Sequence, residues 1–297
     1  MIRCLLVGLI FFISINTVSA QPATNVVVSI RPIHSIVSAL MEEVSEPRLL
    51  LDSNDSAHTF HLKPSQLKLL SNADLLITIG DSFESGLSKV IRNIDQNYRL
   101  NLSEIKELQI YDFRDHNEIE HDEHDEHDKD LHLWLDVGNV QIIAEKIKQR
   151  LIEINPSNKE KYNTNYLELE SKLNQLEEKI QFQLEPIKST PFAIYADILQ
   201  YFEKNFDLNK PVIIAPYHGA RLSINRVIKA KNKMKNQKTR CLIYGSENTS
   251  KQINVLTEGL DIKAHSVDIL GVKLEPGSEQ YFDLMKEILN QLASCLE

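Results

Sequence analysis

The residues best suited to bind a ligand form a run rich in histidine and acid between Asp112 and Asp136. Most of its side chains end in an imidazole or a carboxylate, the groups that bind borderline divalent metals in proteins. Within this run, each histidine between Asp112 and Asp130 directly follows an acidic residue: His116, His121, His124 and His127. The run therefore indicates metal binding.

The part from Asp112 to Asp130 contains ten acids and only two basic residues, which gives it a net charge of −8. Such residues cannot build an apolar core, so we predict a solvated, mobile loop that carries accessory metal ligands. A plain acidic linker is the alternative. The run ends at His132, which stands directly before the apolar residues Leu133, Trp134 and Leu135.

The charge outside this loop is nearly balanced, because the whole chain has a formal net charge of −9. We therefore expect no nucleic-acid partner. A length of 297 residues with 42% hydrophobic content suits two modest domains. Residues 1–20 resemble a signal peptide, with Arg3 before an apolar run and small residues up to Ala20. We expect cleavage there and export to the periplasm.

Export would remove Cys4 and leave Cys241 and Cys295 in an oxidising compartment. An even number of cysteines in that compartment predicts a disulfide, which would tie a C-terminal helix to a strand. Two buried free thiols are the alternative.

Short apolar runs alternate with helical patterns in both halves of the chain, which predicts an α/β fold with parallel sheets. We expect an N-terminal lobe over residues 21–155, including the loop 112–130, and a C-terminal lobe over 189–297. Apolar residues recur every three or four positions between Pro156 and Pro186, which predicts one stiff connecting helix (156–188) of about 40 Å. A coiled-coil dimer is the alternative, and we expect a monomer.

Two lobes joined by one helix suggest a cleft between them. In parallel sheets, binding sites lie beyond the carboxyl ends of the strands. His58 lies in a loop that follows such a strand, so we expect it at that edge of the sheet.

Several fragments in a common order resemble the metal-specific solute-binding proteins of ABC importers, and most closely their periplasmic zinc-uptake branch. The fragments span the mature chain and include Ser29–Ser35, Ser56–Phe60, Leu62–Ser65, Asn72–Leu75, the histidine-rich loop, His132–Asp136, Tyr201–Glu203, Val267–Gly271 and Ala293–Leu296.

The resemblance implies that the metal lies between the lobes and that His58 and His132 are its N-lobe ligands. It implies a role for Asp268 at the site, because the matching aspartate coordinates the metal in manganese-type relatives and lies close to it in zinc-type ones. It also supports a disulfide between Cys241 and Cys295. The implied partner is an inner-membrane ABC permease.

The departures from the family pattern fall in the C-terminal lobe. Ala196 stands where a histidine or glutamate is usual, and alanine cannot bind a metal. Tyr244-Gly245-Ser246 replaces the usual Ala-Glu-Pro. Zinc usually takes four ligands. The remaining candidates, each with an ordinary structural alternative, are Asp197, His218, Glu247 or water.

The sequence therefore predicts a periplasmic binding protein that captures a divalent metal, most consistent with zinc, and not an enzyme. We expect the loop to concentrate metal or to sense its excess. The alternatives are a manganese or iron protein of the same family, a relative with a weakened site, and a zinc hydrolase. The last finds no support in a His-Glu-x-x-His or Gly-x-Ser-x-Gly motif.

Overall fold

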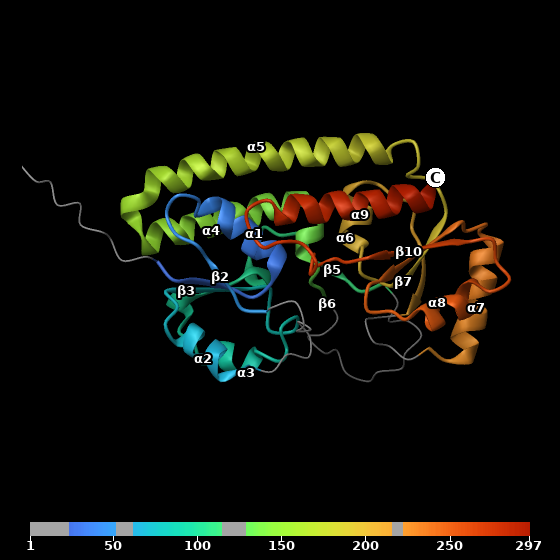
Figure 1. The fold of residues 1–297 in the computed structure, drawn as a ribbon, viewed down its shortest axis with the longest axis horizontal. Coiled ribbons are helices and arrows are strands. Elements are labelled where there is room, and N and C mark those ends of the chain that lie inside the picture. The colour runs from blue at the N-terminus through green and yellow to red at the C-terminus, as the bar shows by residue number, and fades with distance from the viewer. Residues whose placement is uncertain (1–23, 52–61, 115–128, 216–221) are drawn as a thin grey trace, which may run out of the picture.

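The structure is a computed structural model that describes residues 24–51, 62–114, 129–215 and 222–297. Its elements form two lobes side by side, and helices α5 (Lys159–Leu184) and α9 (Gln280–Leu296) lie across both of them (Figure 1). The predicted fold, two βα lobes with parallel sheets and one long helix, is confirmed. Among the described residues, no helix has the combination of length and apolar character needed to cross a membrane.

The N-terminal lobe is built on a four-stranded parallel sheet with the strand order β2-β1-β3-β4. Its two central strands consist entirely of buried residues, as expected for a sheet covered on both faces. The strands are β1 (Val26–Val28), β2 (Arg48–Leu49), β3 (Leu75–Thr78) and β4 (Arg99–Asn101), and the helices are α1 (Arg31–Leu40), α2 (Pro64–Ser71), α3 (Ser88–Ile91) and α4 (Val137–Ile154).

The C-terminal lobe repeats this plan with a second four-stranded parallel sheet in the order β10-β9-β7-β8. Parallel neighbours need long crossover connections, and helices supply them. The strands are β7 (Phe192–Ala196), β8 (Val212–Ala215), β9 (Cys241–Gly245) and β10 (Lys263–Val267), and the helices are α6 (Gln200–Asn205), α7 (Ile224–Asn236) and α8 (Ser250–Thr257).

The long helix α5 follows the predicted pattern, because its recurring apolar residues Leu169, Leu173, Leu176, Ile180 and Leu184 are all buried. It does not stand between the lobes as a bare connector. It packs against α1 and α4 of the N-terminal lobe and against α9, which itself packs on both α1 and β10. The two lobes therefore share a helical layer.

The two ends of the histidine-rich loop are ordered, which the sequence did not suggest. They form a short antiparallel ribbon in which β5 (Tyr111–Asp112) pairs with β6 (Lys129–Asp130). The side chain of Lys129 also donates to that of Asp112 at 2.6 Å. The boundaries predicted for the loop, 112 and 130, are therefore too wide. The interior of the loop, like the predicted signal peptide, lies outside the described residues.

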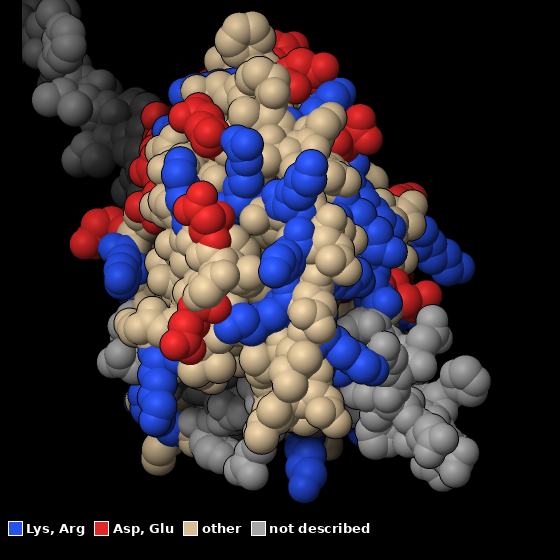
Figure 2. Space-filling view, turned by 90° about the vertical axis from the view of Figure 1, so that its right-hand side faces the viewer, with Lys and Arg blue, Asp and Glu red and all other residues tan. Residues whose placement is uncertain are grey.

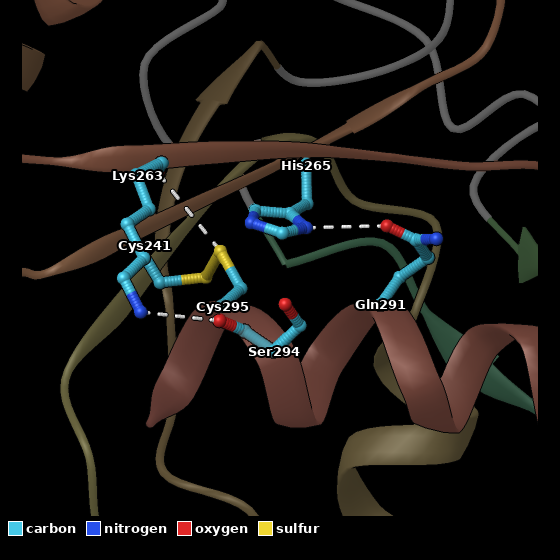
Figure 3. Close-up of a disulfide and its surroundings, with 6 residues drawn as sticks. All are labelled: Cys241, Lys263, His265, Gln291, Ser294 and Cys295. Atoms are coloured by element: carbon cyan, nitrogen blue, oxygen red, sulfur yellow. Dashed lines mark hydrogen bonds between the residues drawn. A yellow bond between two sulfur atoms is a disulfide. The ribbon is translucent and has the colours of Figure 1, made fainter.

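The predicted disulfide is present and joins Cys241, the first residue of β9, to Cys295 near the end of α9 (Figure 3). The Cα atoms of the two cysteines are 5.2 Å apart. Beside the bond, His265 of β10 and Gln291 of α9 are hydrogen-bonded at 3.2 Å. The disulfide thus fastens the sheet of the C-terminal lobe to a helix that also covers the other lobe.

We expect the double variant Cys241→Ser with Cys295→Ser to lose about 2–4 kcal/mol of unfolding free energy, because the bond closes a long loop in the unfolded chain. The sequence separation of the two cysteines is 54 residues. Urea unfolding measures the loss, and a reductant should weaken the wild-type protein without affecting the variant. Equal stability of the two proteins would show that the bond does not constrain this fold.

Candidate metal centre

His132 is held rigidly in the N-terminal lobe. It follows β6 and directly precedes a short 3-10 helix, Leu133–Leu135, whose three side chains are fully buried. Burial of these residues draws the histidine inward, so that only 2% of it is exposed. The apolar residues after His132, which the sequence showed, therefore explain its fixed position.

The imidazole of His132 is oriented by a buried carboxylate, Asp130. The distance from His132 Nδ1 to Asp130 Oδ1 is 2.6 Å, and the same oxygen accepts from the backbone N–H of His132 at 3.0 Å. A carboxylate that accepts from Nδ1 selects the tautomer with its lone pair on Nε2, which is the usual second-shell arrangement of a metal-binding histidine.

This role is not evident from the sequence, in which Asp130 ends the acidic run. The structure buries Asp130 completely. An acid two residues before His132, next to a buried apolar run, is the signal that points to it.

Asp130 is held in turn by the opposite lobe. Gln200, at the start of α6, donates to Asp130 Oδ2 at 3.3 Å. The hydroxyl of Tyr201 donates to the backbone carbonyl of Asp130 at 2.6 Å and accepts from the N–H of Tyr111 at 3.2 Å. The orientation of His132 therefore depends on contacts that cross between the lobes.

A second buried acid, Glu84, supports the wall of aromatic residues beside His132. It accepts hydrogen bonds from the Ser29 hydroxyl at 2.5 Å and from the N–H groups of Ile79 and Gly80 at 2.9 and 2.8 Å. Burial raises the pKa of Glu84 to about 7. These bonds join the segments that follow β1 and β3.

The neighbour of Glu84, Phe83, lies edge-on to the rings of both His132 and Trp134, with centroid distances of 5.9 and 5.4 Å. Glu84 thereby fixes a ring that contacts the candidate ligand. Nothing in the sequence around Glu84 singles out this acid.

The segment after β10 contacts the N-terminal lobe two residues from His132 in the sequence, because Trp134 Nε1 donates to the carbonyl of Ile269 at 2.7 Å. Asp268 directly precedes Ile269. Its carboxylate, however, accepts from the N–H groups of Leu270, Gly271 and Val272 at 3.0, 2.9 and 2.7 Å. In this structure Asp268 organises a turn, which also uses the positive φ of 64° at Gly271.

An ion-pair cluster fills the place where a C-lobe ligand was expected. Arg114, just after β5, donates to both carboxylate oxygens of Asp197 and to both of Glu203. Its Nη1 lies 2.6 Å from Glu203 Oε2, and its Nε lies 3.0 Å from Asp197 Oδ2. Both acids are almost fully buried. Burial raises the pKa of Glu203 to about 7, against the opposing effect of Arg114.

This cluster shows how Asp197, a candidate C-lobe ligand, is used in the structure. Ala196 ends β7 and pairs with Ala215 of β8, so neither strand offers a metal donor at this position. Asp197, the next residue, was a candidate replacement. Both of its oxygens are engaged by Arg114, so the structure makes it part of the lobe interface.

The remaining candidates divide into described and undescribed residues. Glu247 follows β9, and its carboxylate lies directly over Gly245, where a Cβ atom would come within 2.2 Å of it. Because Glu247 is exposed and its side chain is flexible, this carboxylate could move aside, so the contact does not by itself require glycine at position 245. His58, His218 and the four loop histidines lie outside the described residues. Within the described ranges, no group of three or more His, Cys, Asp or Glu side chains is placed to hold a metal.

Comparison with known proteins places the chain among zinc-uptake proteins. Residues 26–295 match the sequence profile of the family described as ZnuA, zinc-uptake complex component A, periplasmic. The chain belongs to the ZnuA family. The high-affinity zinc uptake system protein ZnuA of Brucella abortus (strain 2308) is 30% identical over 304 residues, which cover 91% of each chain. The protein of the same name from Yersinia pestis is 27% identical over 92% of this chain and 91% of its own.

Solved structures agree on the fold. A crystal structure of ZnuA matches with a TM-score of 0.77 at 18% identity and covers 93% of this chain and 100% of its own. A manganese-bound periplasmic metal-binding protein from Candidatus Liberibacter asiaticus has a TM-score of 0.77 at 19% identity, over 92% of this chain and 100% of its own. The two-lobed architecture is thus that of the ZnuA family.

Replacement of Arg114 by Met should destabilise the protein by about 3–5 kcal/mol, because it leaves two buried carboxylates without their cation. The loss should be larger at about pH 8 than at about pH 5. Arg114 lowers the pKa of Glu203, so its removal raises the folded-state pKa of this carboxyl further. A carboxyl whose pKa is raised in the folded state costs stability as the pH rises from its unfolded pKa towards its folded pKa, so the variant should lose more stability at the higher pH. Urea unfolding at the two pH values measures both effects.

Arg92→Met is the matched control. Arg92 pairs with Asp81 at 3.0 Å, but its side chain is 67% exposed. We expect this change to cost less than about 1 kcal/mol at either pH. If the two variants had equal stabilities, the buried cluster would contribute no more than an ordinary surface ion pair.

Proposed function

We propose that this protein is a periplasmic binding protein that captures zinc and delivers it to an ABC-type permease in the inner membrane. The observation that carries the proposal is the buried Asp130–His132 pair, in which a carboxylate holds the imidazole in the tautomer whose Nε2 carries the lone pair that binds a metal. Membership of the ZnuA family supports it. In this role the protein carries a cargo and makes or breaks no covalent bond.

The proposed metal ligands are His58 and His132 from the N-terminal lobe. Two imidazoles favour zinc over ions that prefer oxygen donors alone. Asp268 is the proposed donor from the facing lobe. A carboxylate has about four lone-pair sites, and three backbone N–H groups use three of them here, so Asp268 has little capacity left unless its turn rearranges. If the turn keeps this form, a water molecule is the expected ligand in place of Asp268.

Manganese is the second candidate cargo, and the observation in its favour is Ala196. Loss of the C-lobe histidine shifts the balance of available donors from nitrogen towards oxygen, which suits a harder ion. The periplasmic metal-binding protein from Candidatus Liberibacter asiaticus, which has the same fold, has solved structures with manganese bound and with cadmium bound. A titration with both zinc and manganese separates the two cargoes.

We further propose that residues 115–128 act as an accessory that concentrates zinc near the lobe interface or senses its excess. Their histidines and acids bind zinc individually with weak affinity, and together they raise its local concentration. Because Asp130 orients His132, a deletion that tests this role must end at residue 128.

Calorimetric titration of the metal-free protein with zinc tests the site. We expect His58→Ala with His132→Ala to abolish the tight binding event, because both proposed N-lobe ligands are lost. We expect Asp130→Asn to weaken it about 10- to 100-fold, because the amide no longer fixes the tautomer of His132. The deletion of residues 115–128 should remove only weaker binding events.

His265→Ala is the control for general effects of removing an imidazole. His265 lies on β10 beside the disulfide and bonds to Gln291 (Figure 3). The His265→Ala substitution should leave the zinc affinity unchanged. Undiminished tight binding in the His58/His132 double variant would exclude the proposed site, and loss of tight binding on loop deletion would move the main site into the loop.

A further inference from the structure

One stretch of the C-terminal lobe is strongly basic although the protein as a whole is acidic. Between Asp207 and Glu247 the sequence contains no Asp or Glu, but it contains the basic residues Lys210, Arg221, Arg226, Lys229, Lys231, Lys233, Lys235, Lys238 and Arg240. Five of them lie within α7, which has no acidic residue. Helix α8 beside it contains one lysine and no acid.

Helix α7, which carries five of these residues, lies at one end of the molecule (Figure 1). Helices α7 and α8 lie at the end of the C-terminal lobe that points away from the N-terminal lobe (Figure 1). Viewed from that end, Lys and Arg side chains are spread over a broad face and outnumber the Asp and Glu side chains among them (Figure 2). We call the exposed side of α7, with Lys238 after it, the basic face.

The lysines at the C-terminal end of the basic face are not used to hold the fold. Lys233, Lys235 and Lys238 are exposed, and none of them forms an ion pair with a described residue. Lys231 differs, because its ammonium donates to the carbonyls of Val255 and Glu258 and so joins α7 to α8. These three charges lie within six residues and have no acidic partner among the described residues, so they give this end of the helix a positive potential that attracts an anionic surface.

The N-terminal half of the same helix exposes large apolar side chains. Ile224 is 79% exposed and Ile228 is 51% exposed, and a spacing of four residues places them on one side of the helix. Helix α7 turns Ala230 and Met234 towards the sheet, so these isoleucines do not serve the core. Basic residues beside exposed apolar ones are the pattern of helices that lie in the headgroup region of a bilayer.

We propose that the basic face of α7 binds the surface of a membrane that contains anionic phospholipid. Flexible lysines suit phosphate groups, which need no fixed geometry, and the two isoleucines suit shallow insertion among the headgroups. A protein partner fits less well, because lysine is depleted from protein–protein interfaces. For a binding protein that serves a membrane permease, this contact keeps the carrier close to its acceptor, and only this consequence rests on the proposed function.

Sedimentation with vesicles tests the proposal, with a chain that begins at Gln21 so that the apolar residues 5–15 take no part. We expect binding to vesicles with equal parts of phosphatidylglycerol and phosphatidylcholine, no binding to phosphatidylcholine alone, and weakening as salt rises from about 0.05 M to about 0.5 M. Lys233→Gln with Lys235→Gln and Lys238→Gln should weaken binding at least about tenfold. Ile224→Ser with Ile228→Ser should weaken the vesicle binding that remains at high salt.

The matched control changes the same number of charges elsewhere. Lys68→Gln with Lys159→Gln and Lys179→Gln removes exposed lysines from α2 and α5 and should leave vesicle binding unchanged. Equal weakening by the two triple variants, or no binding to phosphatidylglycerol, would overturn the proposal. Binding to polyglutamate but not to vesicles would assign the face to an acidic protein partner. Zinc calorimetry on the same variants should show no change, which separates this proposal from the proposed function.

Discussion

The structure of the candidate metal centre depends on one buried carboxylate, that of Asp130. It bonds to the imidazole of His132 in its own lobe and accepts from Gln200 in the other lobe. A buried carboxylate is stable only when its hydrogen bonds are satisfied, so the two lobes must stay close enough to satisfy it. The ligand geometry on one side of the interface is therefore set partly by the other side. The hydroxyl of Tyr201, which bonds to the carbonyl of Asp130, reinforces the same constraint.

The Arg114 ion-pair cluster gives the interface a second fixed point. Where relatives are expected to place a metal ligand, this chain has Ala196, and the adjacent Asp197 is bound by an arginine from the opposite lobe. A guanidinium thus supplies positive charge between the lobes without any metal. Helix α9 packs on both lobes, and α5 packs on the N-terminal lobe and on α9. These helices and the Arg114 cluster together hold the two lobes against each other.

The sequence was sufficient to predict the parts of the fold that follow from periodicity. The buried face of α5, the parallel alternation in both lobes and the pairing of Cys241 with Cys295 all depend on residue type and spacing. The sequence also correctly placed His132 at the junction of a charged segment and a buried one. Its apolar neighbours Leu133, Trp134 and Leu135 made that position predictable, because their burial leaves the histidine little freedom.

Contacts between residues distant in the sequence were not predictable in this way. Asp130 and Arg114 were read as part of a solvated loop because their neighbours are charged, whereas their burial comes from partners 70 to 89 positions away in the opposite lobe. Glu84 was missed because a single acid inside an amphipathic stretch normally faces solvent. In each case hydrogen bonds within the folded structure bury a charged side chain that its sequence neighbours suggest is exposed. No local sequence pattern indicates these bonds.

The most direct test of the account is the identity of the atoms that bind zinc. X-ray absorption at the zinc edge, on protein loaded with one equivalent, counts the imidazoles in the first shell. The account predicts two, with oxygen donors completing the usual four-coordinate shell, and predicts a change of spectrum in His132→Ala. An unchanged spectrum in that variant, or a shell without imidazole, would contradict the assignment of His58 and His132 as the ligands.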